Sequence, residues 1–176
     1  MKKLIALTFL FAFSFFGLTS TVCGQKQKPK DFANRFYRTY LELNARGLPG
    51  DKELKSLAPF LSDDLRRLFE KARDKQKRFV EENSADEKPP WADGDLFTSL
   101  FEGAQTFKIG KAKTRGAYTE ISVHLKYREN GETARWNDTL VLVETNEGWR
   151  VWNILLNGDW QFKNGSDLRR ILGAEN

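Results

Sequence analysis

Apolar side chains recur at steps of three to four residues in two stretches of the first half of the chain, which is the spacing of amphipathic helices. Pro29 and Asp31 are suitable residues to open the first helix, and Gly47 and Pro49 stop it. Its apolar stripe is largely aromatic: Phe32, Phe36, Tyr37, Tyr40 and Leu43.

A second, longer helix is predicted after Ser62, which is a suitable cap, with Asp63 and Asp64 at its positive end. A short helical turn around Leu54 and Leu57 precedes it. The basic residues of this helix are offset by acidic ones, so we interpret its charged side as a solvated face. The apolar side consists of Leu61, Leu65, Leu68, Phe69, Ala72 and Phe79.

A polar segment at residues 83–95 includes Pro89 and Pro90 and cannot continue the helix, because proline lacks the amide donor. It is therefore expected to be a long connection, with Trp91 pinned to the body of the domain. Asp95 is expected to cap a short helical segment that begins at Leu96.

From about residue 105 the pattern changes to alternation, which predicts strands separated by turns. In the segment 118–128, one face carries Ile121, Val123, Leu125 and Tyr127, and the other carries Glu120, Ser122, His124 and Lys126. Asn130–Gly131 is a strong hairpin signal, because both central positions of that turn favour positive φ. About four antiparallel strands are predicted, followed by a closing helix over 166–172.

This order of elements predicts an α+β fold in which the N-terminal helices pack on a strongly curved, cone-like antiparallel sheet of about four strands, with a short C-terminal helix. The segments "GDLFTSLFEGAQTF" and "EGWRVWNILLNG...LRRILG" resemble the envelope proteins grouped as domain of unknown function 3828, in the nuclear-transport-factor-2-like superfamily. That resemblance covers about residues 30–173 and implies the cone-shaped fold. It implies no established catalytic residue.

The N-terminal segment has the pattern of an export signal, because Lys2 and Lys3 are followed by an uncharged apolar run and then by small residues. We expect residues 1–24 to be a signal peptide, 25–29 a flexible basic lead-in and 30–173 a single domain. Cleavage after Gly24 would remove Cys23. The alternative is a membrane-anchored lipoprotein with a lipid anchor at Cys23, although the preceding Ser-Thr-Val fits that pattern poorly.

Cys23 is the sole cysteine, so the exported chain is expected to have neither a free thiol nor a disulfide. An export signal on a chain without structural disulfides indicates a periplasmic or secreted envelope protein. The net charge of +5 includes Lys2 and Lys3, and the mild excess that remains does not favour nucleic-acid binding. The sequence lacks the motifs of phosphate, dinucleotide and zinc sites, so we expect no cofactor, no metal and no membrane span after signal cleavage.

A cone of this kind can enclose a pocket between sheet and helices. The candidate ligand-binding residues are Tyr37, Tyr40, Trp136, Asp138 and Trp152. In the last strand, "WRVWN" places Trp152 where relatives of this kind often have an acidic residue. The tryptophans are expected first as core and rim packing and second as a wall for stacking a ligand.

The leading hypothesis is an exported, noncatalytic envelope protein that binds a protein or small ligand through this pocket. The alternative is a small lyase or isomerase that uses Asp138 or His124, and a third is an inhibitor or immunity-like protein. Asp138 attracts the enzymatic interpretation only if it faces inward, and His124 is expected on the polar face.

"KIGKAKTRG" places Lys108, Lys111, Lys113 and Arg115 in one strand without an acidic residue among them. Two interpretations remain open. The lysines can guard the edge of a sheet against pairing with another strand. They can also bind an anionic partner such as a polysaccharide or a lipid headgroup.

Overall fold

The computed structural model describes residues 27–160 and 166–173, and the predicted signal peptide and Cys23 lie outside these residues. Apart from the short helix expected at Leu96, the predicted helices and strands occur in the predicted order, so the α+β class is confirmed. The elements are α1 (Pro29–Leu43), α2 (Asp51–Leu57), a 3-10 turn (Ala58–Phe60), α3 (Asp63–Glu82), β1 (Thr106–Arg115), β2 (Tyr118–Glu129), β3 (Glu132–Thr145), β4 (Gly148–Leu156), β5 (Ser166–Asp167) and α4 (Leu168–Gly173).

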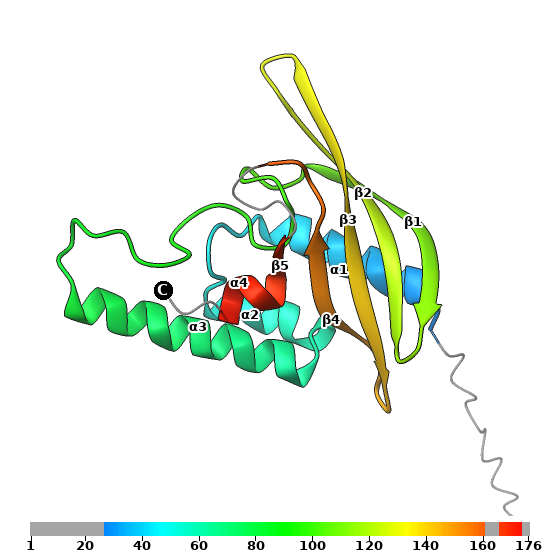
Figure 1. Cartoon of the computed structure of the whole chain (residues 1–176), viewed down its shortest axis with the longest axis horizontal. Helices are drawn as coiled ribbons and strands as arrows, with labels where there is room; N and C mark the ends of the chain where they lie inside the picture. The colour runs from blue at the N-terminus through cyan, green and yellow to red at the C-terminus, as the bar shows by residue number, and fades with distance from the viewer. Residues whose placement is uncertain (1–26, 161–165, 174–176) are drawn as a thin grey trace, which may run out of the picture.

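Helix α1 lies against the sheet and contacts β1 and β2 (Figure 1). Its aromatic stripe faces inward as predicted, with Phe36 and Tyr37 fully buried. The Phe36 ring meets those of Phe60 and Phe97 edge to face at centroid distances of 5.9 and 6.2 Å, a favourable arrangement for aromatic pairs. Burial of this stripe holds α1 on the sheet.

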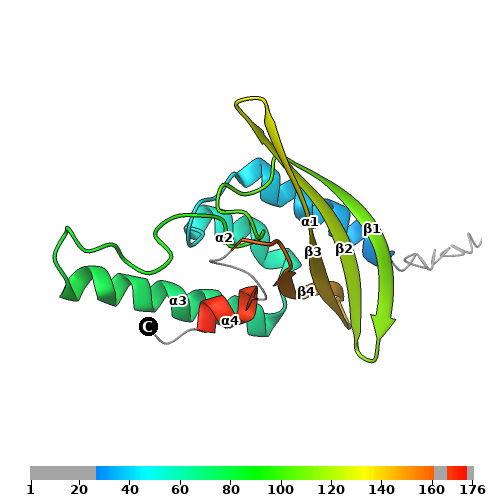
Figure 2. The same cartoon turned by 45° about the horizontal axis from the view of Figure 1, so that its top comes forward.

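Helix α3 is placed differently from the prediction that the N-terminal helices pack on the sheet. Its start is fixed to β4, because the Ser62 backbone N–H donates to the Val151 carbonyl at 2.9 Å. The Ser62 hydroxyl also accepts from the Leu65 N–H, which confirms the predicted cap. From there α3 runs away from the sheet, as both views show (Figures 1 and 2).

The physical reason lies in the composition of α3. Its buried residues, Leu65, Phe69 and Ala72, all fall in the first half of the helix. Most residues after Arg73 are exposed, and Val80 remains 60% accessible. The second half of α3 therefore has too narrow an apolar stripe to be held against a sheet face.

The sheet has five strands in the order β1-β2-β3-β4-β5, and all neighbouring pairs are antiparallel. Asn130 and Gly131 have φ of 49° and 86°, which confirms the predicted hairpin turn. The two-residue β5 pairs with Leu155 and Leu156 where a helix was expected to begin, so α4 starts at Leu168.

The expectation of a strongly curved cone is wrong, because the sheet is open and neither closed nor strongly curled. Long β2 and β3 pair in unbroken register from Tyr118–Val143 to Glu129–Glu132. The register shifts lie at the flanking pairs instead, between Ile109 and Ala112 in β1 and between Val141 and Leu142 opposite β4. The central pair thus lacks the bulges that would bend it sharply.

The long connection after α3 crosses back over the molecule and is fixed by its tryptophan, as predicted. The Trp91 indole N–H donates to the Ile171 carbonyl of α4 at 3.2 Å. The Lys75 ammonium lies 5.9 Å from the centre of the Trp91 ring, within the range of a cation–π contact. Within residues 27–160 and 166–173, no helix combines the length and the apolar character needed to cross a membrane.

Candidate functional site

The candidate residue Asp138, whose direction the sequence left open, is completely buried on β3 and is saturated by hydrogen-bond donors. Its Oδ2 accepts from the Ser99 backbone N–H at 2.8 Å and from the Trp136 indole N–H at 3.0 Å. Its Oδ1 accepts from the Ser99 hydroxyl and, at 2.9 Å, from the Asn157 backbone N–H. A buried carboxylate is stable when paired in this way, so Asp138 ties the connection 95–103 to the sheet.

A second buried carboxylate, Asp95, organises the start of the same connection. It accepts from the backbone N–H groups of Phe97 and Thr98 at 2.7 and 2.6 Å and from the Tyr40 hydroxyl at 2.5 Å. The expected capping role is confirmed, but Asp95 caps a turn and no helix begins at Leu96. Phe97 is thereby held in the core, with its ring 5.7 Å from that of Phe69.

Tyr37 is the exception in this well-paired interior. Its hydroxyl is buried and has no hydrogen-bond partner within the described part of the chain. Burial raises the pKa of Tyr37 well above its usual value, and the charges of Asp138 and Asp95 raise it further. Burial likewise raises the pKa of Tyr40, reinforced by Asp95.

These two phenols predict a loss of stability at alkaline pH. A tyrosine whose pKa is higher in the folded state contributes stability that is complete below its unfolded value, about 10, and is lost as the pH rises above it. We expect the free energy of unfolding, measured in urea, to fall steeply above about pH 10. Tyr37→Phe removes one titrating group and no hydrogen bond, so its curve should fall less steeply. Identical curves would contradict the assignment to Tyr37.

Four of the five candidate pocket residues come together, but as a packed core. Tyr37, Tyr40, Trp136 and Asp138 are at most 7% exposed, and the edge-to-face Trp160 ring covers Trp136 at 5.3 Å. Ser99, which completes the Asp138 site, was not predicted. The signal available for it was a small polar residue inside the apolar run "LFTSLF".

Trp152 is not part of this group. It lies at the irregularity in β4, where Val151 and Asn153 pair with successive residues of β3, so simple alternation does not give its direction. Its ring meets Tyr118 at a centroid distance of 4.5 Å, and the Arg169 guanidinium lies 4.7 Å from the ring centre. Tyr118 alternates with buried Thr119 and Ile121 and therefore belongs to the opposite face of the sheet.

His124 is exposed on that opposite face, as predicted. Its Nδ1 lies 2.5 Å from Asn137 Oδ1 on β3. On the other side, Gly110 of β1 leaves room for the ring because it has no Cβ. A Cβ there would lie 2.8 Å from His124 Nε2. His124 is thus held across three strands on an open surface.

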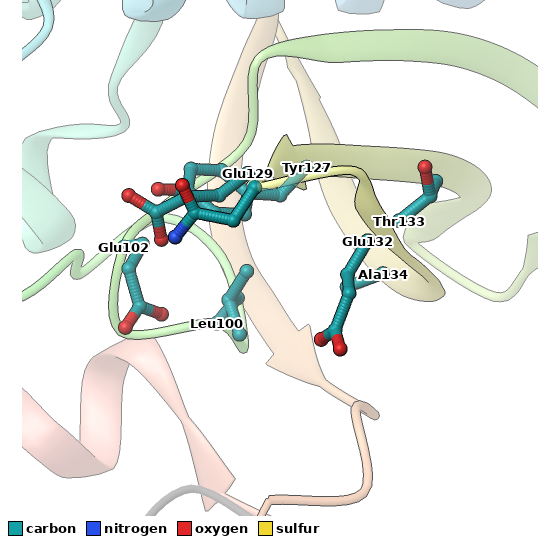
Figure 3. A pocket seen from close by; sticks show the side chains of 8 residues that line it. Leu100, Glu102, Tyr127, Glu129, Glu132, Thr133 and Ala134 are labelled. Atoms are coloured by element: carbon teal, nitrogen blue, oxygen red, sulfur yellow. The ribbon is translucent and has the colours of Figure 1, made fainter.

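A hollow of about 510 Å³ lies between the β2–β3 hairpin and the connection at Leu100, and it is lined by Glu102, Glu129 and Glu132 (Figure 3). Partial desolvation raises the pKa of Tyr127 in its wall, and the charge of Glu129 adds to the shift. Across the residues that the structure describes, no three His, Cys, Asp or Glu side chains are placed to hold a metal ion. The hollow is an acidic surface feature without such a centre.

The face of the sheet opposite the core is strongly cationic. Cross-strand partners share a face, so the register places Lys126 with Arg135 and Lys108 with His124. Among the paired residues of β1–β3, the one carboxylate on this face belongs to Glu120. Its Oε2 lies 3.1 Å from Arg115 Nε. We call this surface the cationic face; its basic residues are Lys108, Lys113, Arg115, Lys126, Arg128 and Arg135.

Comparison with known proteins adds no relative: no family model, no curated protein and no solved structure matches the chain.

Proposed function

We propose that this chain is an exported, noncatalytic envelope protein that binds its partner through the cationic face. The interior is poorly suited to ligand binding, because the candidate pocket residues Tyr37, Tyr40, Trp136 and Asp138 are packed and buried. Asp138 also already accepts hydrogen bonds from four donors. The single observation that carries the proposal is the cationic face itself, a broad charged surface on the side of the sheet away from the hydrophobic core.

The enzymatic alternative is less well supported by this geometry. A general base must reach a substrate in a partly desolvated site. Asp138 is committed to Ser99, Trp136 and Asn157, and His124 stands on an exposed surface. Four surface hollows are lined in part by Glu102, Leu172, Val80 and Trp152, respectively. Neither Asp138 nor His124 lines any of these four.

Export and family membership remain part of the proposal. The charged start and apolar run of residues 1–18 support a signal peptide and a periplasmic or secreted location. The resemblance to the domain of unknown function 3828 group supports an envelope role within the nuclear-transport-factor-2-like superfamily. The α+β order of elements is compatible with that superfamily, although the sheet is more open than the cone shape implies.

The test is capture of partners from an envelope extract with tagged protein. We expect Lys126→Gln/Arg135→Gln to lose the material that the unmodified protein retains. The matched control is Lys52→Gln/Lys55→Gln, which removes two exposed charges from α2 instead. A cationic-face variant that retains the same partners as the control would contradict the proposal.

A further inference from the structure

Guarding of a sheet edge does not account for the whole cationic face. β1 is an edge strand, so its Lys108 and Lys113 fit that interpretation. Arg128 and Arg135 lie in the end of the β2–β3 hairpin beyond the stretches paired with β1 and β4, but Lys126 pairs with Thr106 of β1 on one side and with Arg135 of β3 on the other. The charge of Lys126 therefore protects no edge.

The arrangement of Lys126 and Arg135 also lowers the stability of the fold. Lys126 and Arg135 are direct cross-strand partners in the β2–β3 ladder. Like charges placed directly opposite each other in a sheet are destabilising. Within the chain as described, neither residue forms an ion pair with a carboxylate. A negative charge supplied from outside the chain would relieve this repulsion.

The cations are spread along the sheet and do not converge on one point. From Lys108 to Arg115, β1 extends over roughly 23 Å at about 3.3 Å per residue. The polar side chains between the charges, including Ser122, Asn137 and Thr139, can hydrogen-bond hydroxyl groups. At one end lies the half-buried Tyr118–Trp152 pair, with the Arg169 guanidinium 4.7 Å from the Trp152 ring centre, and the exposed part of such an aromatic pair can contact a sugar ring.

We propose that the partner of the cationic face is a linear acidic polysaccharide that lies along the strands, an inference that rests on the proposed function. A small anion would need converging cations. A membrane surface would favour apolar side chains that insert, yet Val80 and Phe101, the exposed large hydrophobic residues among those described, lie on α3 and the connection.

The experiment is titration of the protein with polygalacturonate, which carries one carboxylate per sugar, in about 0.01 M salt, where charges are weakly screened. We expect binding, with Lys126→Gln/Arg135→Gln about thirtyfold weaker, since each of the two cations near an anionic surface contributes about fivefold. Lys52→Gln/Lys55→Gln should change the affinity less than about twofold. Because the first variant removes a like-charge pair, its urea unfolding midpoint should not fall.

Comparison probes fix the class of partner. Monomeric galacturonate should bind at least about a hundredfold more weakly than the polymer, because the polymer makes several contacts at once. Neutral dextran should not bind. Tighter binding to poly-L-glutamate, to single-stranded DNA or to phosphatidylglycerol vesicles would overturn the assignment, as would no binding to polygalacturonate or an equal loss in the α2 control.

These outcomes are distinguishable from failure of the proposed function. If polygalacturonate does not bind but the cationic-face variant still loses an envelope partner, the polysaccharide class is wrong and the binding role stands. If neither assay depends on Lys126 and Arg135, both proposals fail.

Discussion

Asp138→Asn should lower the free energy of unfolding by about 2–4 kcal/mol, because the buried carboxylate accepts from four donors and an amide cannot. The new NH₂ group would face either the pair formed by Ser99 N–H and Trp136 Nε1–H or the pair formed by Ser99 Oγ and Asn157 N–H. Urea unfolding of the purified variant measures the loss.

The matched control is Glu132→Gln, the same carboxylate-to-amide change at an exposed position of β3. It should shift the free energy of unfolding by no more than about 0.5 kcal/mol. If Asp138→Asn were as stable as this control, the carboxylate would not be needed to hold the connection, and a functional role for Asp138 would regain support.

Phe97→Ala should cost about 3–5 kcal/mol, the range for removal of a buried phenylalanine side chain from a core. Phe97 is 1% exposed, and its ring contacts those of Phe36, Tyr40 and Phe69. The variant leaves a cavity where α1, α3 and the connection meet, so the change should appear as a lower urea midpoint.

Phe101→Ala is the control from the same connection, because Phe101 is 42% exposed. Its ring lies over Gly94 at the surface, and its loss should cost less than about 1 kcal/mol. Equal losses for the two variants would show that Phe97 does not anchor the connection in the core.

Elements with strong local patterns were predictable from the sequence. The spacing of Phe32, Phe36 and Tyr40 gave α1, and Asn130–Gly131 gave the central hairpin. The alternation of residues 118–128 gave the two faces of β2, with Ile121 buried and His124 exposed. Local periodicity is sufficient where a strand alternates without interruption.

Features that depend on distant contacts were not predictable. The irregularity in β4 removes the parity argument for Trp152, so alternation does not give the direction of its side chain. β5 is only two residues long and exists because Ser166 and Asp167 meet Leu156 and Leu155. The outward course of α3 follows both from its largely exposed second half and from its attachment to Val151, and no pattern within α3 reveals that attachment.

The cationic face was visible in the sequence only in part. "KIGKAKTRG" revealed the β1 charges, whereas Lys126 and Arg135 are separated along the chain and meet through pairing of β2 with β3. Only the register shows that they lie directly opposite each other. That juxtaposition turns a guarded edge into a surface suited to an anionic partner.

The most direct test of a surface-binding role is amide chemical-shift mapping by NMR during titration with polygalacturonate. The account predicts shifts that centre on Lys108, Lys126 and Arg135 and leave the amides of Tyr37 and Phe97 unchanged. Shifts centred on Tyr37, Phe97 and Ser99, with an undisturbed cationic face, would contradict it and place the binding site inside the fold.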